Sequence, residues 1–242
     1  SCRIRTDVAA KFLICTMYCG EPDLPYHLKA MSEQGVIVDH RIFSFMSEVD
    51  AHNAVYQAFN EAGPEWIRGK VDADVVLNPG VLAGIKATGR AWIDPTTHDY
   101  FTDAPLHAGV AFYGPDVRFK VQTNTLKCDR NVANCHGPQG KGVVGRHCHY
   151  ADEWTGFHFG FHRGLKSQLP VHEAVMKAHR RHGDRVRLMA IRGFELAQSD
   201  RYKDYHLGHA PVTADHNYGE GLKKLFDEFR VDVPPVLTRT WR

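Results

Sequence analysis

Apolar segments and helical segments alternate along the first third of the chain, and this alternation most constrains the fold. Short apolar segments rich in Val, Ile and Phe occupy residues 11–19, 36–46 and 66–77, and their length and composition predict buried strands. Segments 25–34 and 51–62 lie between them and have helical periodicity. A strand–helix–strand–helix–strand order at this spacing predicts a parallel sheet with right-handed crossovers, and therefore an α/β fold.

The second half of the chain is less regular. Apolar segments 109–113 and 143–149 predict two further strands, and segments 152–167 and 171–182 predict two helices. Residues 127–142 are polar and glycine-rich and predict a loop.

Two aspartates, Asp72 and Asp74, interrupt the third apolar segment, in the stretch KVDADVVLNPG. A buried carboxylate costs several kcal/mol unless it is paired, hydrogen-bonded or bound to a cation. Side chains at i and i+2 point the same way from an extended strand. Because ligands of parallel sheets bind at the carboxyl ends of the strands, we expect both aspartates at that edge, either in water or sharing a positive ligand.

The composition is that of an ordinary globular chain. Of 242 residues, 43% are hydrophobic and 24% are charged, and no apolar run approaches the ~20 residues that span a bilayer. The N-terminal residues lack the pattern of a secretory signal peptide, and the six cysteines do not form a dense disulfide framework. We therefore expect reduced thiols and a cytoplasmic protein.

The order of these motifs resembles the nucleotide-binding half of family-2-like glycosyltransferases with the GT-A fold, of the small bacterial and phage type. The resemblance rests on TMYCGEPDLPYHLKAMSEQ, on AHNAVYQAFNEAGPEWIRGKVDADVVLNPGVL and on the Asp-x-Asp within it. The segment HCHYADEWTGFHFGFHRGLK resembles the acceptor half of the same family. The chain departs from the family in lacking an acidic pair at the end of the second predicted strand, and no QxxRW motif of processive synthases follows.

The resemblance implies the domain organisation. Residues 1–242 would form one GT-A-like domain with a mostly parallel central sheet flanked by helices. A Rossmann-like nucleotide-sugar half would occupy residues 10–90, and an acceptor half with C-terminal helices would occupy residues 91–242.

The resemblance also implies an activity, that of a metal-dependent hexosyl- or pentosyltransferase. The donor would be a nucleotide sugar, with a UDP-sugar as the first choice, and the acceptor hydroxyl stays open between a glycan and a hydroxymethylated DNA base. A divalent cation, Mn²⁺ or Mg²⁺, would stabilise the leaving diphosphate. Both ions prefer oxygen ligands, and Mn²⁺ also accepts imidazole.

The resemblance implies that Asp74 binds the metal directly and that Asp72 contacts the metal or the ribose. Family members often take a further metal ligand, frequently a histidine, from the second half, where His147 and His149 are the candidates. These histidines alternate about Cys148, so we expect both to face one side. We prefer His147 because it lies nearer the predicted strand, and a surface or hydrogen-bonded histidine is the alternative for either.

Further donor-binding residues are assigned to polar positions of the same segments. They are Thr16, Tyr18, Glu21, Ser44, Asn53, Lys70 and Asp72. Arg163 and Lys166 lie one turn apart on a predicted helix and are assigned to the diphosphate or to an anionic acceptor.

An inverting transferase also needs a carboxylate that takes the proton from the acceptor hydroxyl. Asp152 and Glu153 lie where family members carry an acidic pair, and Asp129 is the other candidate. Asp152 equally fits the N-cap of the helix that follows it. A retaining enzyme would need no such base, so the assignment stays open.

Two other functions stay open as well. A nucleotidyltransferase or pyrophosphorylase also combines a parallel sheet with paired aspartates, but TMYCGEPD lacks the glycine-rich basic loop of that class. A zinc-stabilised nucleic-acid-binding module would use the basic segment 163–192, where eight Lys and Arg stand against two acidic residues. Its zinc ligands would come from Cys128, Cys135, His136, His147, Cys148 and His149.

Overall fold

A computed structural model of the chain describes residues 10–122, 138–140, 142–202 and 220–232. Asp129, one of the predicted bases, lies outside the described residues. The same holds for Cys128, Cys135 and His136 of the predicted zinc cluster.

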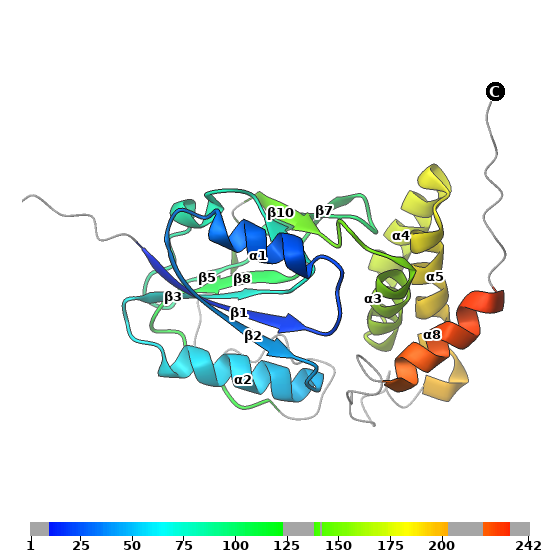
Figure 1. The fold of residues 1–242 in the computed structure, drawn as a ribbon, viewed down its shortest axis with the longest axis horizontal. Coiled ribbons are helices and arrows are strands. Elements are labelled where there is room, and N and C mark those ends of the chain that lie inside the picture. The colour runs from blue at the N-terminus through cyan, green and yellow to red at the C-terminus, as the bar shows by residue number, and fades with distance from the viewer. Residues whose placement is uncertain (1–9, 123–137, 141, 203–219, 233–242) are drawn as a thin grey trace, which may run out of the picture.

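The first half of the chain forms the predicted strand–helix unit. β1 (Lys11–Tyr18) pairs in parallel with β2 (Ile37–Ser44) on one side and with β3 (Trp66–Val71) on the other. The crossovers are α1 (Leu24–Ser32) and α2 (Glu48–Glu61), which lie on opposite faces of the sheet (Figure 1). The prediction of an α/β fold is confirmed.

The alternation of apolar residues in β1 explains why both faces of this sheet are covered. Phe12 and Ile14 belong to the core cluster on the α1 side, while Leu13 and Cys15 belong to the cluster on the α2 side. All four side chains are essentially inaccessible to solvent. A strand buried on both faces is typical of parallel sheets.

The rest of this sheet is mixed, so beyond β3, among the described residues, the predicted parallel pairing is found only between β5 and β9. β8 (Val110–Tyr113) runs antiparallel to β3, β5 (Trp92–Ile93) runs antiparallel to β8, and β9 (Pro138–Gln139) is parallel to β5. Between β3 and β8 the chain forms one short 3₁₀ turn, Val81–Gly84, and no crossover helix. Parallel pairing needs a long crossover, whereas antiparallel pairing does not.

A second sheet of four strands takes up the remaining strands. Its order is β4 (Val75–Leu77), β10 (Val143–His147), β6 (Thr96–Asp99) and β7 (Ala104–Leu106). β10 is antiparallel to β4 and parallel to β6.

The predicted strand 66–77 is therefore two strands that belong to different sheets. Asp72, Ala73 and Asp74 form a turn between them, closed by the hydrogen bond of 3.0 Å from Val75 N–H to the Asp72 carbonyl. The expectation that both aspartates project from one extended strand is wrong. Their expected place after a parallel strand, at its carboxyl end, is confirmed.

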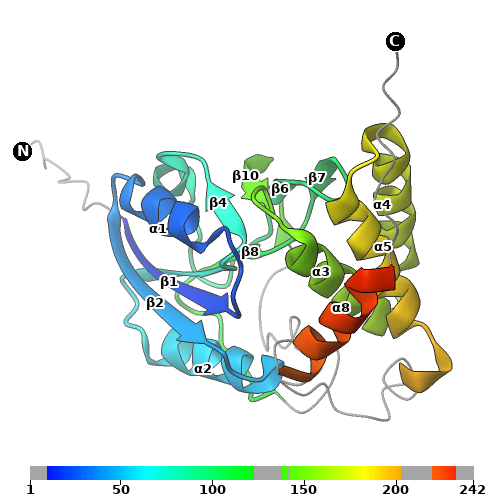
Figure 2. The ribbon, with the colours of Figure 1, turned by 45° about the vertical axis from the view of Figure 1, so that its right-hand side comes forward.

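The helices of the second half gather at the carboxyl ends of β1 and β2 (Figures 1 and 2). α3 (Glu153–Leu165) and α4 (Leu169–His182) correspond to the two predicted helices. α5 (Arg185–Ala197), the short 3₁₀ turn Asp200–Tyr202 and α8 (Glu220–Asp232) were not predicted. In the described ranges, none of the helices has both the length and the apolar character to cross a bilayer.

Close packing against α5 fixes the orientation of α3. Gly156, Gly160 and Gly164 lie one turn apart on the face of α3 that meets α5, and a Cβ atom on Gly160 would overlap the carbonyl oxygen of Ala190. Phe157 and Phe161 are buried in the same helix cluster. With one side of α3 held in this way, another side of the helix faces the ends of the first sheet.

Candidate functional site

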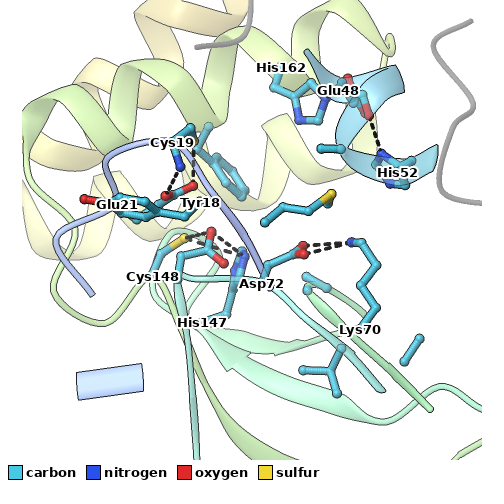
Figure 3. Close-up of a pocket in the computed structure, with 18 of the residues that line it drawn as sticks. Tyr18, Cys19, Glu21, Glu48, His52, Lys70, Asp72, His147, Cys148 and His162 are labelled. Atoms are coloured by element: carbon cyan, nitrogen blue, oxygen red, sulfur yellow. Dashed lines mark hydrogen bonds and ion pairs between the residues drawn. The ribbon is translucent and has the colours of Figure 1, made fainter. Parts of the chain in front are cut away.

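A cavity of about 690 Å³ lies between the carboxyl ends of β1, β2 and β3, the start of α2, and α3 (Figure 3). Ligand sites of open parallel sheets occupy this position, in the crevice outside the carboxyl ends of the strands. Of the predicted site residues, the structure brings eight to the cavity wall. They are Tyr18, Glu21, Lys70, Asp72, Asp74, His147, Arg163 and Lys166.

One face of α3 forms the wall opposite the strand ends. The residues of α3 and its C-cap that line the cavity recur at the three- and four-residue intervals of a helix face. They are Thr155, His158, Phe159, His162, Arg163 and Lys166.

Asp74, His147 and Cys148 form a tight cluster in the cavity wall. Asp74 Oδ2 lies 3.2 Å from His147 Nε2, and Cys148 Sγ lies 3.3 Å from the same oxygen and 3.6 Å from the same nitrogen. The other oxygen of Asp74, Oδ1, is buried and has no hydrogen-bond partner among the residues that the structure describes. These three side chains can hold a metal ion. Asp74 and His147 are metal ligands that the resemblance implied, and Cys148 was a candidate only in the alternative zinc site.

A fourth residue, Asp99, fixes the histidine of this cluster. His147 and Asp99 are register partners in the parallel pair β10–β6, and His147 Nδ1 lies 2.6 Å from Asp99 Oδ2. Asp99 Oδ1 accepts a hydrogen bond of 2.6 Å from the backbone N–H of Thr102. Since the carboxylate accepts from Nδ1–H, Nε2 faces Asp74 and Cys148. No local sequence signal points to Asp99, because its contact with His147, 48 positions further along the chain, depends on pairing between two strands.

The ionisable groups of this cluster shift one another's pKa values so that the charged forms are favoured. Burial disfavours the charged form of His147, but Cys148, Asp74 and Asp99 outweigh it and raise the histidine pKa well above its usual value. Burial likewise opposes ionisation of Asp74, but His147 outweighs it and holds the pKa of that carboxyl well below its usual range. In the metal-free protein, the cluster is therefore an imidazolium held between two carboxylates.

Asp72, the other predicted metal residue, pairs with a lysine instead. Lys70 Nζ lies 2.8 Å from Asp72 Oδ1, and both side chains line the cavity. The backbone N–H of Asp72 donates to the carbonyl of Gly109 at 2.8 Å. Gly109 has a φ of +69°, and a Cβ atom there would overlap the side chain of Val75. Glycine at 109 thus allows the second half of the chain to approach the aspartate turn.

Glu21 follows the end of β1 and lies beside the cluster of Asp74, His147 and Cys148 (Figure 3). Its carboxylate accepts from the backbone N–H of Cys19 at 2.8 Å and from the Cys19 thiol at 2.7 Å. Burial, together with the negative charge of Asp74, raises the pKa of Glu21 to about 7. Tyr18 and Glu21 both line the cavity.

A second polar group lies elsewhere in the cavity wall, as Figure 3 shows. Glu48, buried in the first turn of α2, lies 3.2 Å from Lys166 Nζ and 3.2 Å from His162 Nε2. Arg163 donates to the side chain of Gln168 at 2.9 Å. Lys166 and Arg163 thus supply positive charge to the same cavity that the aspartate turn lines. The sequence analysis did not assign Glu48 to the site, because an acidic residue directly after Ser47 is already explained by its place in the first turn of a helix.

Two predicted donor-binding residues lie outside the cavity wall and have structural contacts. Thr16 is buried, and its hydroxyl lies 3.0 Å from His27 Nε2 and 2.9 Å from His40 Nε2. The side chain of Asn53 bonds both backbone groups of Gln122. Thr16 therefore belongs to a buried network between β1, α1 and β2, and Asn53 fixes the segment that follows β8.

His149 does not join His147, so the expectation that both face one side is wrong. The strand ends at His147, and Cys148 has a φ of +54°, in the left-handed region. This turn breaks the alternation on which the expectation depended. His149 is exposed and contacts Arg146 Nη1 at 3.0 Å. Ser44, a further predicted donor residue, is also exposed and is not among the residues that line the cavity.

Neither member of the predicted acidic pair is among the residues that line the cavity. Asp152 caps α3, because its side chain accepts from the backbone N–H of Thr155 at 2.8 Å. Glu153 pairs with Arg185 at 2.6 Å. These contacts favour the capping interpretation of Asp152.

The basic segment 163–192 does not form one surface. Arg187 is buried and pairs with Asp184 at 2.6 Å, whereas Arg181 lies on the surface and pairs with Asp103 at 3.1 Å. With Arg163 and Lys166 at the cavity, the positive charge is divided among the cavity, the protein interior and the surface.

Comparison with protein-family models, with curated proteins and with solved structures finds no match for this chain. What the site can do follows from its own chemistry. A carboxylate, an imidazole and a thiol meet at one point of the wall, and cationic side chains line the same cavity. This arrangement suits a bound divalent cation and a ligand with phosphate groups.

Proposed function

We propose that this protein is a metal-dependent glycosyltransferase that takes its sugar from a nucleotide-sugar donor, with a UDP-sugar as the first choice. One observation carries the proposal. Asp74, from the turn at the carboxyl end of β3, meets His147 at 3.2 Å in the wall of a cavity of about 690 Å³. This pairing joins the two halves that resemble donor-binding and acceptor-binding halves of GT-A enzymes.

The residues at this point fit a divalent cation. Asp74 Oδ1 is a buried acceptor that lacks a hydrogen-bond partner in the described part of the chain, and His147 presents Nε2 on the same side as Asp74 Oδ2. When bound, the ion would neutralise the charge that develops on the leaving diphosphate.

The side chains of the chain itself would bind and orient the donor. Tyr18 and Glu21 lie at the end of β1, where the resemblance assigns the nucleotide. Arg163, oriented by Gln168, can donate two parallel hydrogen bonds to a phosphate, and Lys166 adds a point charge.

A proton acceptor for the acceptor hydroxyl must face the cavity. Apart from Asp72 and Asp74, the carboxylates that line it are Glu21, Glu48 and Asp94. Of the three, Glu48 lies against α3, on the side that resembles the acceptor half. Glu48 is therefore the candidate base among these carboxylates, whereas Asp152 and Glu153 lie outside the cavity wall.

The proposal is tested with purified full-length protein, a panel of nucleotide sugars and Mn²⁺. Products are detected by mass spectrometry with glycans and hydroxymethylated DNA as acceptors, and binding of UDP is measured by calorimetry. Asp74→Asn should weaken metal-dependent UDP binding by about 100-fold, equivalent to about 2.7 kcal/mol. Asp227→Asn, which alters an exposed carboxylate of α8, should change nothing.

The released product separates the proposal from the alternative. A free nucleoside diphosphate indicates sugar transfer, whereas pyrophosphate indicates a nucleotidyltransferase or pyrophosphorylase. Absence of both products and of nucleotide binding across the panel, or Asp74→Asn binding UDP as wild type does, contradicts the proposal.

A further inference from the structure

The donor atoms of Asp74, His147 and Cys148 form a nearly regular triangle. Its sides are 3.2 Å from Oδ2 to Nε2, 3.3 Å from Oδ2 to Sγ and 3.6 Å from Nε2 to Sγ. Zinc bonds of about 2.0 Å to oxygen and nitrogen and about 2.3 Å to sulfur, at the tetrahedral angle, place O and N about 3.3 Å apart and sulfur about 3.5 Å from each. The triangle thus has the dimensions of one face of a zinc tetrahedron.

We propose that Asp74, His147 and Cys148 are the ligands of a Zn²⁺-type site, in place of the Mn²⁺ or Mg²⁺ that the resemblance implies. The thiol decides between these ions. Mg²⁺ and Mn²⁺ select hard oxygen ligands, whereas thiolate and imidazole together select zinc and ions of similar softness. The ligand set rests only on these three side chains, while the role of the ion in sugar transfer rests on the proposed function.

The ligands are held before any ion binds. Asp99 fixes the ring of His147 through Nδ1, as carboxylates commonly do behind zinc-bound histidines. Cys148 has a left-handed backbone, and its N–H donates to the carbonyl of Asp74 at 2.8 Å. A non-glycine residue in this conformation costs free energy and persists where its surroundings impose it. Here the conformation brings the thiol to within reach of both other ligands.

The fourth position of the tetrahedron is open on the cavity side. All three ligands are cavity-lining residues, and three protein ligands with one open position characterise catalytic zinc sites, whereas structural sites are closed by four. The zinc cluster proposed from sequence needed cysteines outside the described residues and His149, which points elsewhere. The site inferred here shares only His147 and Cys148 with it.

The experiment is a titration of the metal-stripped protein with Co²⁺, because the absorption spectrum of bound Co²⁺ shows which kinds of ligand hold it. A thiolate ligand gives a near-ultraviolet charge-transfer band, and tetrahedral Co²⁺ gives intense visible bands. Wild type should show both, and Zn²⁺ should displace Co²⁺, whereas a large excess of Mg²⁺ should not. Cys148→Ser should lose the charge-transfer band and bind Zn²⁺ at least about 100-fold more weakly. Cys19→Ser is the matched control, a cavity-lining thiol outside the triangle, and should keep the band.

A measurement on wild type keeps the test valid where Cys148→Ser does not fold. X-ray absorption of the Zn²⁺-loaded protein should show one sulfur at about 2.3 Å and lighter atoms at about 2.0 Å. A shell of oxygen and nitrogen alone, a Co²⁺ complex without the band, or a band that survives in Cys148→Ser overturns the proposal. None of these readouts involves a sugar donor, so sugar transfer with Mn²⁺ by a protein lacking the band would overturn this inference and leave the proposed function standing.

Discussion

Replacement of Asp99 by Asn tests how the histidine of the site is oriented. Asp99 is fully buried and accepts two short hydrogen bonds, from Thr102 N–H and from His147 Nδ1–H, each 2.6 Å long. An asparagine has one carbonyl oxygen and one amino group in these places, so it can accept only one of the two bonds. If its amino group faces His147, the ring takes the tautomer with its proton on Nε2, which cannot bind a metal.

The size of the effect follows from these contacts. Loss of a buried hydrogen bond to a charged group costs about 1.5–3 kcal/mol, which should appear in the metal-free unfolding free energy. Loss of the carboxylate behind a metal-bound histidine weakens metal binding about 10- to 100-fold, or about 1.4–2.7 kcal/mol. At a Zn²⁺ concentration 100 times the wild-type dissociation constant, wild type should gain about 2.7 kcal/mol, and a variant weakened 100-fold about 0.4 kcal/mol.

Urea unfolding with and without Zn²⁺ measures both quantities in one protein. Asp227→Asn, at an exposed i,i+3 pair with Arg230, is the control and should stay within about 0.5 kcal/mol of wild type in both conditions. An Asp99→Asn protein that loses stability without metal, yet gains as much from Zn²⁺ as wild type, would refute the orienting role. Asp99 would then be a structural partner of His147 and nothing more.

Two further changes test the parts of the fold that hold the site. Gly160→Ala should destabilise the protein by about 3 kcal/mol in urea unfolding, because the added methyl overlaps Ala190 in the α3–α5 contact. Gly84→Ala, which has open space, should be nearly neutral, and equal effects in the two variants would contradict the packing. Burial and the adjacent His27 lower the pKa of His40 to about 4, so its protonation favours the unfolded chain. The contribution of His40 to the unfolding free energy should be steady above about pH 6.5 and fall between about pH 6.5 and 4. His40→Gln should lose about 1 kcal/mol less over that interval, since His40 is half exposed and solvent reduces the full effect. Identical pH profiles would contradict this assignment.

Local patterns predicted the parts of the fold that depend on neighbouring residues. The strands and helices from β1 to β3 have the predicted order, and Asp72, Asp74 and His147 lie at the predicted edge. Each follows from a short apolar segment and the turn after it. Asp152 also carried its local signal, that of a helix cap.

The remainder depended on contacts between distant segments. His149 was misplaced because Cys148, in the left-handed region, breaks the alternation of side chains that a strand would have. Asp99 was missed because only strand pairing brings it to His147. The sequence did contain a signal for a helix such as α5 that packs closely against α3. Three glycines at every fourth position of α3, at 156, 160 and 164, indicate a helix that another backbone approaches closely.

Because the chain passes from the first sheet into the second at the aspartate turn, the site can form only at a late stage of folding. β3 pairs with β8 and β4 pairs with β10, so both partners are synthesised after the first 90 residues. Val75 and His147 are register partners although 72 positions separate them, and such distant pairing forms late because the loop entropy is lost before the contacts form. A nascent chain released at residue 90 would expose the unpaired edges of both strands and hold Asp74 without its histidine. The proposed metal site is therefore complete only after β10 has paired with β4, so metal uptake would report that this pairing has formed.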